Sequence, residues 1–217
     1  MLNSKEIIAK RIALEFKDKS LVNLGIGIPT LVSNFIPHGV TIYLQSENGI
    51  IGIGPDPKPE QRDSKLINPS GNYTTILPYG MYFDTATAFT IIRGGHLDVT
   101  VLGCLEVDQE GSMASWIIPG KLVPGMGGAM DLVVGAKKVI IATLHTNKDG
   151  KSKIKSRCML PLTAYKEVNL IVTEIAVMAV KEDGLHLIER HPDVSIDDII
   201  KKTEARLIIN DVRVMQI

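Results

Sequence analysis

Short, uninterrupted apolar runs rich in β-branched residues are the feature that most restricts how this sequence can fold. The stretch 138–142 reads Lys-Val-Ile-Ile-Ala, and the runs at 99–102 and 21–24 are also apolar except for Thr100 and Asn23. A strand with one face in water alternates apolar and polar residues, and these runs do not alternate. They indicate strands that are covered on both faces, as in sheets flanked by helices. The sequence therefore predicts an α/β fold.

Helix signals alternate with these runs. Asn3 or Ser4 can cap a first helix, because Glu6 occupies the capping-box position, and this helix is expected to end near Asp18. Further helices are expected at 29–36, at 85–92 and after the capping residue Ser195. The other expected strands are 40–45, 139–144, 169–173, 175–180, 185–189 and 206–209, and a Pro/Gly-rich loop is expected at 54–71.

Two dipeptides indicate reversals of chain direction. Asn48-Gly49 and Asp183-Gly184 each follow one apolar run and precede another, which is the pattern of an antiparallel hairpin. The sequence contains no internal repeat and no linker that would separate domains. We therefore predict a single domain of residues 1–217, with a mostly parallel or mixed central sheet flanked by helices.

Composition and charge exclude several classes of protein. The 24 basic and 24 acidic residues cancel, so no net field attracts nucleic acid. No apolar run approaches the roughly 20 residues that a membrane helix needs, and charged residues interrupt the N-terminal apolar residues where a secretory signal would lie. The two cysteines, Cys104 and Cys158, form no metal-binding pattern, and Cys104 lies in an apolar run where burial is expected. We expect a cytoplasmic protein that contacts neither nucleic acid nor a membrane.

One carboxylate stands where an expected strand ends. Glu47 lies in Gln-Ser-Glu-Asn-Gly, directly before the hairpin dipeptide, and taken alone it could simply face water. Ligands of open α/β sheets bind beyond the carboxyl ends of the strands, however, and Glu47 occupies such an end. The glycine turns around Gly25-Ile26-Gly27 and 125–131 are further candidates, although both could also serve packing alone.

Other kinds of site find little support. Neither glycine turn has the spacing of a dinucleotide fingerprint, and no phosphate-binding loop occurs. The five histidines are scattered and no HExxH motif is present, so no metal is expected. The nucleophile motif G-x-S-x-G of serine hydrolases is also absent. Arg93 and His96 are expected to make structural hydrogen bonds, while Gly94-Gly95 could bring backbone donors near a ligand.

Several long motifs occur together in one order. They are VNLGIGIPT, LQSENGIIGIGP, FDTATAFTIIRGGHLD, MASWIIPGKLVPGMGGAMDLVVGAKKVII and CMLPLT. In this respect the chain, from Val22 to about Thr203, resembles the B (beta) subunit of family I coenzyme A transferases of the 3-oxoacid, acetoacetate and butyrate type. The resemblance implies the fold shared by these transferases and sugar-phosphate isomerases.

The resemblance also implies a mechanism. Glu47 matches the glutamate of the family's Ser-Glu-Asn-Gly motif, which takes up coenzyme A as a glutamyl thioester during ping-pong transfer between an acyl-CoA and a carboxylic acid. Gly128 would supply an oxyanion N–H, and Asn23 would bind near the thioester. The other residues implied in substrate or CoA binding are Gly25, Gly27, Asn48, Gly94, Gly95 and Gly127.

Coenzyme A would be a substrate, and no permanently bound cofactor is expected. The resemblance implies an A (alpha) subunit as partner, in a heterodimer or a pair of heterodimers. Two alternatives remain open: an acyl-CoA hydrolase on the same scaffold, in which water resolves the thioester, and a ligand-sensing module that binds reversibly without a covalent adduct.

The sequence departs from the family pattern in two places. Many succinyl-CoA-using members read Asn-Ala-Gly-Lys-Glu-Thr after the catalytic turn, whereas this chain has Gly71 in place of that lysine. A cation that would pair with the extra charge of succinate is then missing, although Arg62 or Lys65 could substitute. Short monocarboxylates and acetoacetate are therefore expected as substrates. Glu106 and Ser115 stand where relatives usually have glutamine and asparagine, with no assigned consequence.

Overall fold

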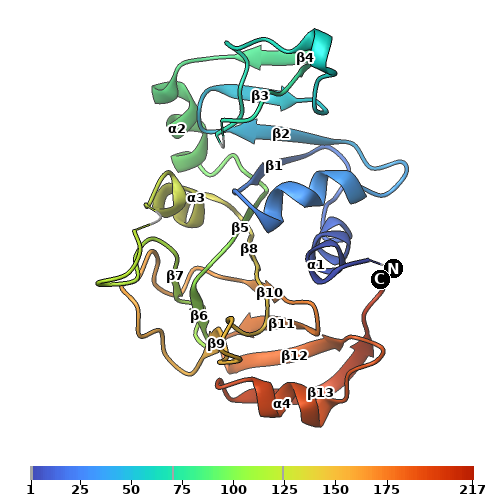
Figure 1. Ribbon diagram of the computed structural model, residues 1–217, viewed down its shortest axis with the longest axis vertical. Helices are drawn as coiled ribbons and strands as arrows, with labels where there is room; N and C mark the ends of the chain where they lie inside the picture. The colour runs from blue at the N-terminus through green and yellow to red at the C-terminus, as the bar shows by residue number, and fades with distance from the viewer. Residues whose placement is uncertain (1, 70, 124) are drawn as a thin grey trace.

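A computed structural model describes residues 2–69, 71–123 and 125–217 of the chain. Ser70, in the loop whose sequence differs from the family pattern, lies outside this range. Within the described part, one ten-stranded sheet runs through the molecule from β4 at the top of Figure 1 to β13 at the bottom. Its strands in spatial order are β13 (Leu207–Val214), β12 (Gly184–Arg190), β11 (Ala176–Lys181), β10 (Leu170–Val172), β8 (Val139–Ala142), β5 (Val99–Leu102), β1 (Ser20–Leu24), β2 (Ile42–Ser46), β3 (Ile50–Ile53) and β4 (Ile76–Tyr82).

The sheet is mixed, as the two hairpin dipeptides predicted. The five central strands β10, β8, β5, β1 and β2 pair in parallel. On one side β2, β3 and β4 pair antiparallel, and the turn at Asn48-Gly49 joins the first two. On the other side β10, β11 and β12 also pair antiparallel, with Asp183 before the start of β12, and β13 adds in parallel.

Both faces of the central strands are covered, which explains their continuous apolar sequences. In β8, Ile140 and Ala142 face one core and Val139 and Ile141 face the other, because successive side chains of a strand point to opposite sides. The first core packs under α1 (Ser4–Ala13) and the 3₁₀ helix η1 (Ile28–Phe35).

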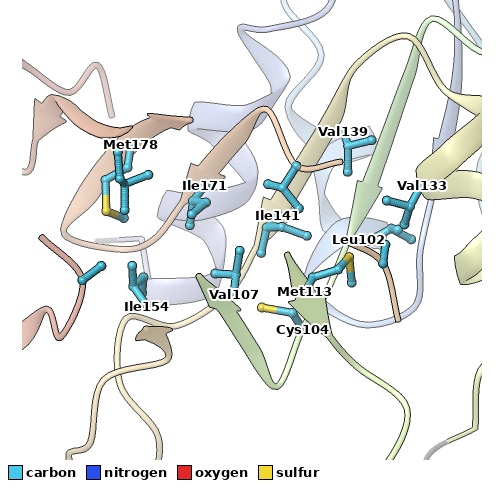
Figure 2. Close-up of a cluster of buried hydrophobic side chains, with 14 of the residues drawn as sticks. Leu102, Cys104, Val107, Met113, Val133, Val139, Ile141, Ile154, Ile171 and Met178 are labelled. Carbon is cyan, nitrogen blue, oxygen red and sulfur yellow. The ribbon is translucent and has the colours of Figure 1, made fainter. Parts of the chain in front are cut away.

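The second core lies under α2 (Thr85–Arg93) and α3 (Ala129–Gly135), and Figure 2 shows its central part. A small sheet of β7 (Met113–Ala114), β6 (Glu106–Asp108) and β9 (Ile154–Lys155) closes it. Cys104 lies in this core, as expected, and burial raises the pKa of its thiol to about 11. The remaining helices are α4 (Ile196–Lys202) and the short 3₁₀ helix η2 (Pro59–Gln61).

The expected helix caps are present. The Asn3 side chain accepts hydrogen bonds from the backbone at the start of α1, and the Glu6 carboxylate accepts one from the Asn3 N–H, which completes the capping box. Ser195 caps α4 by accepting from the N–H of Asp198. None of the described helices combines the length and the apolar composition that crossing a bilayer requires.

Two helices and two strands differ from expectation. The first helix ends at Ala13, where the N–H groups of Glu15 and Phe16 bond to carbonyls three residues back rather than four. The segment 28–35 is a 3₁₀ helix whose cap, Gly27, offers no side chain to the first turn. β4 was not anticipated, because Pro78 and Gly80 argue against a strand, and both are tolerated at the edge of the sheet. The last strand extends five residues beyond the expected end, to Val214.

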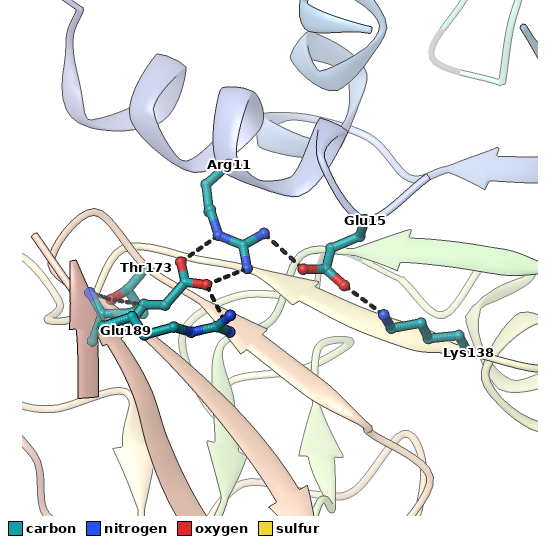
Figure 3. Close-up of polar contacts among 7 residues, drawn as sticks. Arg11, Glu15, Lys138, Thr173 and Glu189 are labelled. Atoms are coloured by element: carbon teal, nitrogen blue, oxygen red, sulfur yellow. Dashed lines mark hydrogen bonds and ion pairs between the residues drawn. The ribbon is translucent and has the colours of Figure 1, made fainter. Parts of the chain in front are cut away.

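A buried ion network ties α1 to β12, which lies near one end of the strand order (Figure 3). Arg11, which is 5 % exposed, donates two hydrogen bonds to Glu189 of β12 at 2.6 and 2.9 Å and one to Glu15 at 2.7 Å. Lys138, just before β8, donates to the other oxygen of Glu15 at 2.6 Å. Burial opposes the charges, but these bonds outweigh it, so the pKa of Arg11 is raised and that of Glu15 is lowered.

We predict that Arg11→Met lowers the free energy of unfolding by about 3–5 kcal/mol, because it leaves the Glu189 carboxylate buried without its main partner. The surface variant Lys137→Ala is the control. It breaks an exposed pair with Asp98 and should cost at most about 1 kcal/mol. Urea unfolding of the two variants and the parent chain measures both values, and equal losses would contradict the structural role given to the network.

Candidate active site

Two polar side chains interrupt the apolar central strands at neighbouring positions. Asn23 of β1 and Gln45 of β2 are register partners in the parallel pair, so their side chains project from the same face of the sheet. They are only 1 % and 2 % exposed. Buried polar groups of this kind need hydrogen-bond partners, and the two side chains supply one to each other, with Asn23 Nδ2 donating to Gln45 Oε1 at 2.8 Å.

Glu47 lies immediately beyond this pair, in the turn that follows β2. It is half-buried, and its Oε2 accepts a hydrogen bond from Asn23 Nδ2 at 3.3 Å. The carboxylate therefore lies at the carboxyl end of the parallel strands, where the sequence placed it, and a neutral amide donor faces it. The amide donates a hydrogen bond to the carboxylate but carries no positive charge, so the two groups do not form an ion pair.

The turn that carries Glu47 is fixed by its glycine. Gly49 has a φ of +107°, donates to Ser46 O at 3.1 Å, and accepts from the N–H of Phe83 at 3.0 Å. A Cβ on Gly49 would overlap the Phe83 carbonyl oxygen, so only glycine allows the chain before α2 to approach so closely. Asn48 serves the same turn, because its side chain accepts from the Ser46 hydroxyl and donates to Ile67 O at 2.8 Å.

The start of α3 also lies close to Glu47. Gly128, the buried residue that precedes this helix, is close enough that a Cβ on it would sit 3.7 Å from Glu47 Cγ and 3.4 Å from Phe89 Cζ. No backbone carbonyl among the described residues accepts a hydrogen bond from the Gly128 N–H. The structure thus brings Glu47, Asn23 and Gly128 together, as the resemblance implied.

Two neighbours of Glu47 were missed from the sequence. Phe89 of α2 packs beside Gly128, on which a Cβ would contact both the Phe89 ring and Glu47 Cγ. Gln45 lies beneath, bonded to Asn23. A signal for Gln45 was available, because a polar residue two positions before Glu47 follows an apolar run in a strand that needs apolar side chains. No sequence signal distinguished Phe89 from the core aromatics that helices ordinarily carry.

Two other glycines lie in the loop after β1. Gly25 donates to Val101 O at 2.8 Å and packs against Leu102, so it is fixed at the carboxyl end of the central strands. Gly27 has a φ of +92° and open space around it, at the start of η1. Gly127, beside Gly128, also has a positive φ, 53°, and open surroundings. These backbones are accessible to a ligand at the carboxyl end of the strands.

Gly94 and Gly95 are not brought to Glu47. They end α2, whose start at Thr85 adjoins the Glu47 turn, so the nine-residue helix separates them from the carboxylate. Gly94 packs closely against the ring of His96 and is needed for the exit of the helix. Arg93, next to them, forms an ion pair with Asp131 at 2.6 Å and so links α2 to α3.

The histidines do not gather with other ligating residues. Among the described residues, no group of three or more His, Cys, Asp or Glu side chains could hold a metal ion. His145 is fully buried, and each ring nitrogen faces a threonine hydroxyl, Thr173 at 3.0 Å and Thr203 at 2.9 Å. Burial lowers the pKa of His145 to about 4, so the ring is neutral at physiological pH.

The two unexplained departures have structural partners. Glu106 Oε2 accepts from the N–H groups of Met159 and Leu160 at 2.8 and 3.0 Å, which anchors that segment to the small sheet. Ser115 bonds to the Thr163 hydroxyl through both its N–H and its hydroxyl group. Both residues therefore hold the segment 159–163 in place.

Comparison with known proteins identifies the family. The sequence model described as coenzyme A transferase matches residues 5–202. The chain belongs to the coenzyme A transferase family. It is 53 % identical over 217 residues to the beta subunit of the acetate CoA-transferase of Haemophilus influenzae, covering 100 % of this chain and 97 % of that one. It is 48 % identical over 201 residues to the B component of the succinyl-CoA:3-ketoacid coenzyme A transferase of Helicobacter pylori 26695, covering 93 % and 97 %.

Solved structures of the family share the fold. The acyl-CoA transferase YdiF of Escherichia coli O157:H7 superposes with a TM-score of 0.78 at 27 % identity over all of this chain, which spans 44 % of the YdiF chain. Glutaconate coenzyme A-transferase of Acidaminococcus fermentans superposes with a TM-score of 0.73 at 16 % identity, over 99 % of this chain and 89 % of that one. The α/β fold with a mixed central sheet is thus confirmed.

We predict that Gly49→Ala destabilises this transferase chain by about 2 kcal/mol or more, because both the positive φ and the Phe83 carbonyl oppose a side chain. Gly150→Ala is the matched control. Gly150 also has a positive φ, 75°, but open surroundings, so the cost should be about 1 kcal/mol. Urea unfolding compares the two variants, and a Gly49 variant as stable as the Gly150 variant would show that the close approach to Phe83 does not hold the turn.

Proposed function

We propose that this chain is the subunit of a CoA-transferase that carries the reactive glutamate. The enzyme moves coenzyme A between an acyl-CoA and a short-chain carboxylic or 3-oxo acid, and Glu47 holds CoA as a thioester between the two half-reactions. The observation that carries the proposal is the position of Glu47: a half-buried carboxylate at the carboxyl end of parallel strands, between the Asn23 amide and the Gly128 backbone.

The reaction proceeds in balanced steps. The Glu47 carboxylate attacks the carbonyl carbon of the acyl-CoA, which forms a mixed anhydride and expels CoA as a thiolate. The thiolate then attacks the glutamyl carbonyl carbon, which gives the glutamyl-CoA thioester and releases the first acid. A second carboxylate attacks this thioester, which forms a new anhydride and expels CoA as a thiolate. The thiolate then attacks the acyl carbonyl carbon of the second acid, which gives the new acyl-CoA and restores Glu47.

A carboxylate suits this role because it must itself become an activated acyl group. An anhydride and a thioester preserve the free energy of the substrate's thioester, whereas a serine ester would lose it. Each attack places negative charge on a carbonyl oxygen, and the Gly128 N–H and the Asn23 amide are donors beside the reacting carbon. Phe89 lies beside Gly128, and we assign it a part in keeping water away from the hydrolysable intermediates.

A relative supports the covalent intermediate. The structure of YdiF described as a thioester complex with CoA superposes on this chain with a TM-score of 0.74 at 26 % identity. The arrangement of Glu47, Asn23 and Gly128 in this chain is compatible with the same chemistry.

The names of the relatives support a second, different polypeptide. Relatives of about the same length as this chain are named as the beta or B component of their enzymes, and the YdiF chain is more than twice as long. We propose an A-type (alpha) partner, in a heterodimer or a pair of heterodimers, that completes the walls around Glu47.

We predict that the assembled wild-type complex, mixed with acetyl-CoA and no acceptor acid, gains the mass of CoA less one water on the peptide that contains Glu47. Glu47→Gln should abolish this adduct and reduce transfer by at least about 10³-fold, because an amide nitrogen is not a competent nucleophile. Glu60→Gln, which changes an exposed glutamate in η2, is the control and should keep both the adduct and the activity. Peptide mass mapping and a transfer assay provide the measurements.

The same experiment separates the alternatives. Release of free CoA at the transfer rate without an acceptor acid would indicate a hydrolase. Reversible binding of acyl-CoA with no adduct on any peptide would indicate a sensing module. Full activity in Glu47→Gln would exclude the proposed chemistry.

We further propose that the acids are short monocarboxylates and acetoacetate rather than succinate. Gly71 is exposed, has a φ of +78°, and has no atom near the site that a Cβ would occupy. Of the two cations that could substitute, Arg62 lies over the ring of Tyr73, 5.5 Å from its centroid, and Lys65 is exposed. Neither is fixed in a position to meet a second carboxylate.

We predict that the wild-type complex uses acetyl-CoA or butyryl-CoA with a higher kcat/KM than succinyl-CoA. Gly71→Lys should raise the relative use of succinyl-CoA by about 10-fold or more, since a charge-assisted bond is worth roughly 1.5 kcal/mol or more. Gly71→Met, a side chain of similar length without charge, is the control and should leave the ratio unchanged. A strong succinyl preference in the wild type would overturn this assignment.

A further inference from the structure

The pair beneath Glu47 contains polar atoms without partners. Among the described side chains, Asn23 Oδ1 and Gln45 Nε2 are buried and have no hydrogen-bond partner. Leaving a buried polar atom unpaired costs stability, so these two atoms do not stabilise the fold. The pair belongs to the site around Glu47 rather than to the apolar core.

The contacts of Asn23 determine how its amide is oriented. Three acceptors surround its Nδ2: Gln45 Oε1 at 2.8 Å, the Gln45 main-chain oxygen at 3.2 Å and Glu47 Oε2 at 3.3 Å. Reversing the amide would turn Oδ1 toward three oxygens, so the orientation follows from the chemistry of the neighbours. Gln45 must then present its oxygen to Asn23, which leaves its own Nε2 unpaired.

We propose that Gln45 is a positioning residue of the transfer reaction, acting through Asn23. Its Oε1 makes the shortest of the three contacts and holds the amide so that Nδ2 faces the Glu47 carboxylate. The torsion that turns an asparagine amide is broad and has no strong intrinsic preference. Without Gln45 Oε1, the amide would lose its shortest contact, and both Glu47 and the oxyanions that form on it would lose an oriented donor. This inference rests on the proposed function of Glu47.

The sheet offers a matched control in the same row. Thr100 of β5 is the register partner of Asn23 on its other side, is fully buried, and has no hydrogen-bond partner for its Oγ1 among the described residues. It therefore resembles Gln45 in burial and polarity, but it makes no hydrogen bond to Asn23. Replacing it by valine preserves its shape.

The test is a double-mutant cycle on the complex with its A-type partner. Gln45→Met, Asn23→Ala and the double variant are mixed with acetyl-CoA, and the single-turnover rate of adduct formation on the chain is followed by mass. Gln45→Met should slow formation of the adduct about 10-fold. In the transfer assay with an acceptor acid, KM for the acid should stay within about 2-fold of wild type. In the Asn23→Ala background, Gln45→Met should add less than about 2-fold, because its effect passes through the missing amide. Thr100→Val should stay within about 2-fold of the wild-type rate.

Each outcome decides the matter. A wild-type rate in Gln45→Met, or a full further loss in the Asn23→Ala background, would overturn the role of Gln45. If Gln45→Met fails to assemble, Gln45→Asn replaces it, because this shorter amide keeps the polarity but does not reach Asn23. Absence of any adduct on the wild-type complex would instead refute the proposed function, so the two failures are distinguishable.

Discussion

The parallel pairing of β1 with β2 is the constraint on which the site depends. This register places Asn23 opposite Gln45, and the turn two residues later brings Glu47 within reach of the same amide. A shift of one residue would turn Asn23 to the other face of the sheet and into the core beneath α1. The chemistry proposed for Glu47 therefore depends on strand register.

Three other parts of the structure support the carboxyl end of β1 and β2, where Glu47 lies. Gly49 lets the chain before α2 approach the Glu47 turn, and α2 then presents Phe89. The loop before α3 brings the Gly128 backbone close to Glu47. Farther away, the buried bonds of Arg11 fix α1 to β12, so the helix that covers one face of the central strands is held in place. A carboxylate that must become an acyl group needs such fixed donors, because they are already oriented when charge develops.

The sequence was sufficient for the architecture and for the position of Glu47 at the carboxyl end of the parallel strands, because both depend on local patterns. Continuous apolar runs indicated covered strands, Asn48-Gly49 indicated a hairpin, and the Ser-Glu-Asn-Gly motif within the family resemblance indicated Glu47. It was insufficient where the outcome depends on contacts between distant segments. β4 contains Pro78 and Gly80, and only its place at the sheet edge permits them. Gly94-Gly95 looked suited to a ligand, but the length of α2 places the pair away from Glu47.

Transfer of heavy oxygen tests the central claim most directly. The wild-type complex is cycled with acetyl-CoA and an acceptor acid whose carboxylate oxygens are heavy isotopes, and the peptide that contains Glu47 is then weighed. The proposed sequence of anhydride and thioester leaves one acid oxygen on the glutamate in each cycle, so this peptide should gain heavy oxygen while other peptides do not. Transfer at the normal rate without any isotope in that peptide would contradict a covalent role for Glu47.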